Sequence, residues 1–259
     1  IKAVFYYVIA PVARRRPPIC LAPESSGEII RSLQMGNGDG KISSVSLSVT
    51  LGKNEELLVH PEYIRSMSES ASKSAKWLLD NRYPLTSIAS GLYLLTRLRS
   101  DSDHTHTVSA AEEPLAEVAV IELPAGSKLV LQPQHVVGVI QPQNQPLAIE
   151  SKWRLTSLTA WLTLQLRYLV FSGPAKILVK GCRGVRVDPA GSGQTINQSA
   201  TMGFSANLAY AVNRGEPFIA YARGKQELFD DKFTGGSGYY VSEEMPNLGK
   251  KSGITGKGL

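Results

Sequence analysis

The sequence predicts a mainly β protein built from repeated antiparallel units, and three observations lead to this fold class. The segments 51–64 and 123–136 align without a gap, at a constant offset along their whole length. A shorter echo relates 171–179 to 233–241 in the same way. Apolar residues also alternate with Ser and Thr from Ile42 to Leu51, which is typical of a half-buried strand.

The duplicated segments agree at their apolar positions and differ at their polar ones. Leu51 matches Leu123, and Pro61 matches Pro133. Packing fixes the core-facing positions of a strand and leaves the solvent-facing ones free to change. The pattern therefore indicates two copies of one supersecondary unit, which is a scaffold onto which any chemistry would have to be added.

A weaker echo, in which 136–139 resembles 201–204, extends the repeat to a third copy. The domain organisation that we expect is a lead-in at 1–40, a single β domain at 41–246 with modules at 42–99, 115–181 and 194–246, and a Gly/Lys-rich tail at 247–259.

Local composition predicts the remaining elements. Residues 73–81 fit a short helix around Trp77 that Pro84 stops. The Ser/Thr-rich stretch at 100–114 reads as a polar loop. Residues 155–170 fit both a helical face and a strand, and we favour a short helical turn that leads into a strand.

Composition bounds the class of protein. The chain has 259 residues, 42% of them hydrophobic and 19% charged, which argues against disorder. Its net charge of +6 favours anionic partners such as lipid headgroups or RNA. Cys20 and Cys182 are too few for a disulfide framework. No run of 18 apolar residues occurs, so we expect no transmembrane span.

The first residues carry positive charge only. Lys2 and the run 14–16 are basic, and the first acid is Glu24. An acid-free, Arg-bearing start is typical of a mitochondrial transit segment, although the Ser content is low and Pro17 with Pro18 breaks a helix. We therefore expect a lead-in that is derived from a transit segment.

Only one cluster has metal-binding residue types: Asp101, Asp103, His104 and His106. Two His residues in a His-x-His pattern share one face of a strand, and an Asp would complete a site. The cluster lies in the expected loop without a partner motif, so we favour a solvated loop and expect no metal.

No residue set predicts catalysis or a cofactor. The segment 249–252 has a superficial likeness to a phosphate-binding loop, but Lys251 interrupts it and Glu244 stands where the motif needs Gly. His60 and His135 occupy repeat positions that the other copy fills with Gln132 and Tyr63, which is unlike a catalytic position.

Adjacent carboxylates, as in Asp230 with Asp231 and Glu243 with Glu244, point to opposite faces of a strand and form no acid/base pair. We interpret both pairs as surface or turn residues, and we expect a protein that is not an enzyme.

Two groups are candidates for a partner or an anionic surface. Trp153 and Trp161 are interleaved with Arg residues, which suits a membrane interface or a stacked base, although we favour inward packing of the Trp rings. The second group is a basic run along an expected hairpin, which suits phosphate or is a solvated face; its members are Lys176, Lys180, Arg183 and Arg186.

The last third of the chain carries a family resemblance. Residues 201–210 (TMGFSANLAY) and 224–241 (GKQELFDDKFTGGSGYYV) closely resemble the altered-inheritance-of-mitochondria family, and 129–139 and 171–175 are similar to its repeated strand–turn–strand signature. The resemblance implies a fold like that of the tryptophan RNA-binding attenuator protein, with antiparallel β layers in pseudo-symmetric repeats. It implies no catalytic residues.

The same resemblance implies a mitochondrial protein that is associated with the inner membrane or lies in the matrix. Our first hypothesis is a non-enzymatic scaffold that supports cristae organisation by contacts with inner-membrane or cristae-organising proteins. Repeats with exposed strand edges also favour self-association. The alternative is an RNA-binding or mitochondrial-ribosome-associated subunit, which the positive charge and the fold analogy motivate.

Overall fold

The computed structural model describes residues 2–22, 31–32, 41–69, 71–99, 103–155, 157, 160–161, 165–235 and 238–245. Over these residues the chain is mainly β, and all paired strands are antiparallel. The predicted fold class is therefore confirmed at this level. The finer likeness to the tryptophan RNA-binding attenuator protein stays a prediction.

The strands form three successive units of like order. The first unit contains β2 (Ser46–Leu51), β3 (Glu55–Val59), β4 (Ile64–Ser66), β5 (Ser72–Leu78), β6 (Tyr93–Arg99) and β7 (His104–Ser109). The second contains β8 (Ala116–Leu123), β9 (Lys128–Leu131), β10 (Val136–Pro142), β11 (Ala148–Trp153), β12 (Arg167–Ser172) and β13 (Ala175–Cys182). The third contains β14 (Val185–Pro189), β15 (Gln194–Asn197), β16 (Thr201–Ser205), β17 (Ala209–Arg214), β18 (Phe229–Thr234) and β19 (Tyr239–Glu243).

Short helices and one short strand outside the three units complete the described elements. A continuous N-terminal helical segment runs through α1 (Lys2–Val4), η1 (Phe5–Ile9) and α2 (Ala10–Arg14). Strand β1 (Arg31–Ser32) pairs with β8. The others are α3 (Pro84–Ala89), α5 (Phe218–Ala222) and the 3-10 turns η3 (Pro61–Tyr63), η4 (Pro133–His135) and η5 (Gln198–Ala200).

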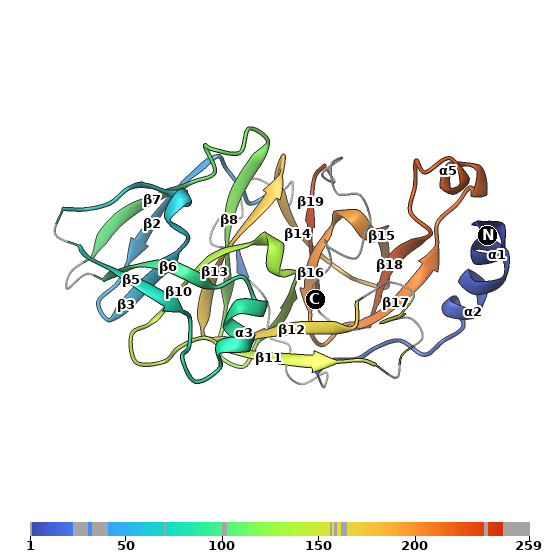
Figure 1. Cartoon of the computed structure of the whole chain (residues 1–259), viewed down its shortest axis with the longest axis horizontal. Helices are drawn as coiled ribbons and strands as arrows, with labels where there is room; N and C mark the ends of the chain where they lie inside the picture. Colours follow the sequence, from blue (N-terminus) through green and yellow to red (C-terminus); the bar gives the residue numbers. More distant parts are fainter. Residues whose placement is uncertain are drawn as a thin grey trace.

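Each unit repeats one pairing rule. Its sixth strand lies between the first and the third, as in β8-β13-β10, and its fifth strand lies between the second and the fourth, as in β3-β6-β5. The third strand of one unit then pairs with the second strand of the unit before it. In the described residues this produces a seven-stranded sheet, β1-β8-β13-β10-β3-β6-β5, and a six-stranded sheet, β11-β12-β9-β16-β19-β14 (Figure 1).

The duplicated segments have the same conformation. Each runs strand, turn, strand, 3-10 turn, strand, through η3 in one copy and η4 in the other. His60 and Gln132, the residues before the two prolines, are both extended, with φ and ψ of −62° and 135° in one and −79° and 130° in the other. This agrees with the preference of a residue that precedes Pro. The predicted duplication is confirmed, and η5 repeats the turn in the third unit.

Buried side chains divide into three clusters over the described chain. The largest lies between the two joined sheets and includes Leu58, Leu129 and Phe171. A second, which includes Leu57 and Val108, is shared between the first and the second unit. The third, around Tyr210 and Phe233, lies under the N-terminal helical segment. Burial of these side chains, at about 25 cal/mol per Å² of apolar surface, is the main favourable contribution to folding.

Two expected elements are wrong. Residues 72–78 form strand β5 and not a helix, and Pro84 begins α3 instead of ending a helix. Within the expected loop at 100–114, residues 104–109 form strand β7. Both strands are rich in polar residues, so local pattern hides them, and pairing with β6 and β2 determines them. A helical turn at Ala160 and Trp161 precedes β12, as expected.

Strand β7 buries one imidazole. His106 lies opposite Val49 with only 1% of its surface exposed, and neither ring nitrogen has a hydrogen-bond partner among the described residues. Burial, together with the neighbouring His104, lowers the pKa of His106. The folded protein therefore holds a neutral imidazole without compensation, which is costly.

We expect a His106→Leu variant to be more stable at neutral pH and less sensitive to acid. A buried His with a lowered pKa binds its proton only in the unfolded chain as the pH falls below about 6.5, so stability is kept above that pH and lost below it. The substitution should raise the free energy of unfolding at neutral pH by about 1 kcal/mol. Urea denaturation at neutral and at mildly acidic pH measures both effects. An unchanged acid dependence would contradict this role of His106.

Candidate functional site

The basic run lies on β13 and β14. These strands do not form the expected hairpin, because β13 belongs to the seven-stranded sheet and β14 to the six-stranded sheet. Lys176 and Lys180 share one face of β13, and both are paired. The Nζ atom of Lys176 lies 3.5 Å from Oε1 of Glu55. Lys180 donates to Glu113 and, at 2.7 Å, to the Tyr63 hydroxyl. The same Glu113 accepts from Tyr63, whose pKa is raised by burial first and by this hydrogen bond second. Carboxylates thus neutralise both lysines.

The two arginines of the basic run differ in their contacts. Arg186 lies 2.9 Å from a Glu244 carboxylate oxygen and 3.5 Å from one of Asp188. Its pKa is raised, first by the hydrogen bond to Glu244. Arg183 is exposed in the turn between the strands, with φ of 58°. The four cations therefore do not form a continuous unpaired basic strip.

The expected inward packing of the two Trp rings is wrong. Trp153, on β11, is 54% exposed, and Trp161 is 53% exposed. The Arg167 guanidinium stacks 5.4 Å from the Trp153 ring, and Trp161 donates to the Leu155 carbonyl at 2.7 Å. Tyr168, by contrast, is buried. An exposed edge strand, not residue type, determines the position of Trp153.

The expectation that both acid pairs lie at the surface is also wrong. Asp231 is fully buried and accepts from the Tyr210 hydroxyl at 2.8 Å. Burial first, and the charge of Asp231 second, raise the pKa of Tyr210. Glu243 is buried as well and accepts from the Cys182 amide at 3.0 Å. Burial raises the pKa of Asp230. One member of each pair thus supports the core.

Three of the four candidate metal-binding residues lie in the described chain: Asp103, His104 and His106. His104 and His106 share one face of β7, while Asp101 lies outside the described residues. Over the part of the chain that the structure describes, no group of three His, Cys, Asp or Glu side chains is arranged to hold a metal ion. The segment 249–252 also lies outside the described residues.

Residues of the second and third units and of the connection between β7 and β8 line one cleft of about 530 Å³. It is lined by Glu113, His135, Lys180, Cys182 and Glu243, among others. The Nδ1 atom of His135 lies 3.0 Å from the Lys180 carbonyl oxygen, so the buried ring is held by backbone. Lys180 pairs with Glu113, and Glu243 accepts from the Cys182 amide, so these charged groups have partners within the protein. We therefore interpret it as a structural seam.

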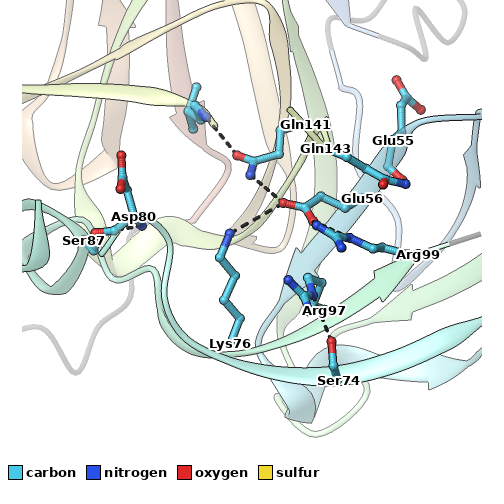
Figure 2. A network of polar contacts seen from close by, with 11 residues as sticks. Glu55, Glu56, Ser74, Lys76, Asp80, Ser87, Arg97, Arg99, Gln141 and Gln143 are labelled. Carbon is cyan, nitrogen blue, oxygen red and sulfur yellow. Dashed lines mark hydrogen bonds and ion pairs between the residues drawn. The ribbon is translucent and has the colours of Figure 1, made fainter. Parts of the chain in front are cut away.

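A second polar network is centred on the buried carboxylate of Glu56 on β3 (Figure 2). One of its oxygens lies 2.7 Å from Nη2 of Arg99, and the other accepts from Gln141 at 2.9 Å and lies 3.5 Å from Nζ of Lys76. Gln141 in turn accepts from the Leu147 amide at 2.9 Å. The network crosses from the first unit to the second, because Glu56 is paired with Gln141 in the ladder of β3 and β10. Its role is to hold the units together.

The N-terminal helical segment packs on the third unit by one stripe. Tyr6, Ala10 and Ala13 recur at helical spacing and are buried. The Tyr6 ring lies 5.0 Å from that of Phe218 on α5, and the Arg214 guanidinium lies 4.5 Å above it. Figure 1 places α5 and this segment side by side at one end of the molecule. The segment is thus fixed to the β body.

The opposite stripe of the same segment is apolar and exposed. Together with Tyr7, whose ring lies 5.2 Å from that of Phe218, and with Ile219 of α5, it forms what we call the apolar tip: Val4, Phe5, Tyr7, Val8, Val12 and Ile219. Lys2, Arg14, Arg15 and Arg16 flank it, and residues 2–22 contain no Asp or Glu. An exposed apolar stripe that is flanked by charges of one sign is typical of an interaction surface.

Sequence reasoning misses the apolar tip for a physical reason. Residues 2–14 belong to the predicted lead-in, and the signal in them is the lack of acids. Only the structure shows that Tyr6 packs against α5, which turns Val4, Val8 and Val12 outward. No helix of the described residues is long and apolar enough to span a bilayer.

Comparison with known proteins identifies a fold and no family. No family model matches the chain, and no curated protein matches its sequence. The chain is similar to the X-ray crystal structure of a protein from Streptococcus pyogenes, with a TM-score of 0.52 and 11% sequence identity over 84% of this chain and 94% of that one. At this identity the likeness shows the arrangement of the β units alone.

Proposed function

We propose that this protein is a non-enzymatic scaffold that docks through its apolar tip on an anionic membrane surface. The observation that carries the proposal is the exposed apolar stripe of a helical segment that is rigidly packed on its other face. An amphipathic helix of this kind lies in the interface, with its apolar side chains among the acyl chains and its cations among the headgroups.

Charge complementarity selects the occupant of the apolar tip. The flanking residues Lys2 and Arg14 to Arg16 are all cationic. Each Lys or Arg near an anionic leaflet contributes about 1 kcal/mol of attraction. Tyr7 adds an amphipathic ring of the kind that prefers the depth of the headgroups, and Phe5 adds apolar surface. An acidic protein surface would satisfy the cations but would leave the apolar stripe exposed to water.

We further propose that the membrane is the mitochondrial inner membrane and that the protein supports cristae organisation through protein contacts. The resemblance of 201–210 and 224–241 to the altered-inheritance-of-mitochondria family supports this setting. Crosslinking in intact mitochondria tests it, and crosslinks to cristae-organising proteins are expected. Partner-free protein in mild-detergent pull-downs would contradict the scaffold role.

Two acidic substitutions in the apolar tip test the docking. We expect Val4→Glu with Val8→Glu to weaken binding to phosphatidylcholine vesicles that contain phosphatidylserine by at least about tenfold, because each replaces an inserting apolar side chain by a charge. Vesicle co-sedimentation measures the change. Val45→Glu is the matched control, since Val45 is 54% exposed and Val8 is 57% exposed, and only Val8 belongs to the apolar tip.

Vesicle composition and salt separate the attraction to anionic lipid from the insertion of apolar side chains. The unmodified protein should bind vesicles with phosphatidylserine more tightly than vesicles of phosphatidylcholine alone, and salt should weaken the difference. Equal binding of the double variant and the unmodified protein would mean that the apolar tip is not the docking surface. Retained far-ultraviolet circular dichroism shows that the variant is folded.

RNA binding is the second candidate, and the ion pairs of the two lysines on β13 weigh against it. Lys176 and Lys180 contact Glu55 and Glu113, so phosphate would have to displace carboxylates. Salt-sensitive co-sedimentation with RNA that is lost in a Lys176→Glu, Lys180→Glu variant would favour this alternative and count against the membrane proposal.

A further inference from the structure

The units are joined twice by the same contact. In each joint the third strand of one unit pairs with the second strand of the preceding unit: β10 with β3, and β16 with β9. Gly138 lies opposite Val59 in the first joint, and Gly203 lies opposite Leu131 in the second. Both glycines directly follow a β-bulge, where the register shifts between 136 and 138 and between 201 and 203.

Two strands that are equivalent to those of the joints have one edge without a neighbouring strand. Among the described strands, β4 pairs only with β7, and β15 pairs only with β18. Both are largely exposed, whereas the equivalent strands inside the joints, β10, β16, β3 and β9, are almost entirely buried. The sheets that contain β4 and β15 belong to the first and the third unit, and Figure 1 shows the labelled strands of these sheets toward opposite ends of the molecule. One chain therefore cannot join them to each other.

The repeat specifies how these edges would meet. Strand β4 has the same bulge, with the register shift between Ile64 and Ser66, so Ser66 occupies the position of Gly138 and Gly203. Ile196, which precedes η5, occupies the position of Val59 and Leu131 before their own 3-10 turns. By the rule of the two internal joints, Ser66 would lie opposite Ile196, and Met67 opposite Thr195.

We propose that β4 and β15 are the two halves of a third joint, whose partner is a second copy of this chain, and that Ser66 keeps this joint from forming. The glycines explain why. A Cβ atom on Gly138 would lie 2.5 Å from the Leu58 carbonyl oxygen, and one on Gly203 would lie 2.2 Å from that of Val130. Ser66 carries such a Cβ atom. Exposed edges invite pairing between molecules, and a single side chain at the closest approach prevents it.

A Ser66→Gly variant tests the block. Analytical ultracentrifugation should find the unmodified protein monomeric over the accessible concentrations and the variant in oligomers, because a head-to-tail contact leaves a free β4 or β15 edge on each added copy until a ring closes. Ser72→Gly is the matched control, since Ser72 is an exposed serine on β5, the edge strand of the seven-stranded sheet. It should stay monomeric. A monomeric Ser66→Gly variant with native circular dichroism would overturn the proposal.

Cysteine pairs test the register. Met67→Cys and Thr195→Cys are placed on separate copies of the Ser66→Gly variant, with Cys20 replaced by Ser in both. Mild oxidation should produce a disulfide-linked dimer when the two are mixed and none when either is alone, because only the mixture places the two thiols opposite each other. Linkage within either single variant, or none in the mixture, would contradict the assigned joint. The same linked dimer from copies that retain Ser66 would show that Ser66 is not a block.

Discussion

Gly203→Ala is expected to destabilise the protein severely, although it adds only a single methyl group. The new Cβ atom would lie 2.2 Å from the Val130 carbonyl oxygen and 3.2 Å from the Leu131 Cα atom. Both contacts are with backbone, so a side-chain rotation cannot relieve them, and β16 must move away from β9. Overpacking of this kind costs about 3 kcal/mol, and lost ladder hydrogen bonds add to it.

The control for this substitution is Gly52→Ala. A Cβ atom on Gly52 would meet the flexible Glu55 side chain at 3.5 Å, an ordinary contact, and Gly52 is outside the joints. Its free energy of unfolding should change by less than about 1 kcal/mol, and loss of chain entropy in the unfolded state favours a gain. Urea denaturation compares the two variants. Equal stability of both would mean that the joint adapts to the added carbon.

Glu56→Ala is the second large effect, at about 2 kcal/mol of lost stability. The side chain is almost completely buried, and its removal leaves the Gln141 amide without its acceptor. Arg99 and Lys76 also lose their carboxylate, but both reach solvent in part, which limits the cost. Because Gln141 belongs to the second unit, the joint of β3 and β10 should weaken first.

Glu150→Ala provides the comparison for Glu56. Glu150 contacts Lys128 and Lys152, which is a similar set of partners, but it is considerably more exposed. Exposed ion pairs contribute about 0–1 kcal/mol. Thermal unfolding should therefore separate the two Glu variants clearly. If both lose the same stability, the buried network is no more important than a surface pair.

The duplication was predictable because core packing and turn conformation require the same residue types at equivalent positions of both copies. Leu51 and Leu123 end equivalent strands, and Pro61 and Pro133 begin equivalent 3-10 turns, so apolar side chains and prolines fix both position and conformation. The pattern could not show that the third strand of each unit completes a sheet of the unit before it. That pairing is made between residues far apart in the chain.

The missed strands and surfaces share one cause. Strand β7 (HTHTVS) carries few apolar residues, because partners on both edges stabilise it, and local pattern contains no trace of these partners. Residue type places Trp153 inside, because Trp is usually well buried, yet it lies on an edge strand. The apolar tip depends on α5, which lies near the opposite end of the sequence from Val8.

Because each large sheet takes its strands from two units, no unit is a self-sufficient folding domain. A cut between β13 and β14 would strip β9 of its neighbour β16 and expose the apolar side chains that their ladder covers. Each fragment would therefore contain an incomplete sheet. We therefore expect the three units to unfold together in one cooperative transition, in contrast to solenoids, whose repeats can unfold one after another.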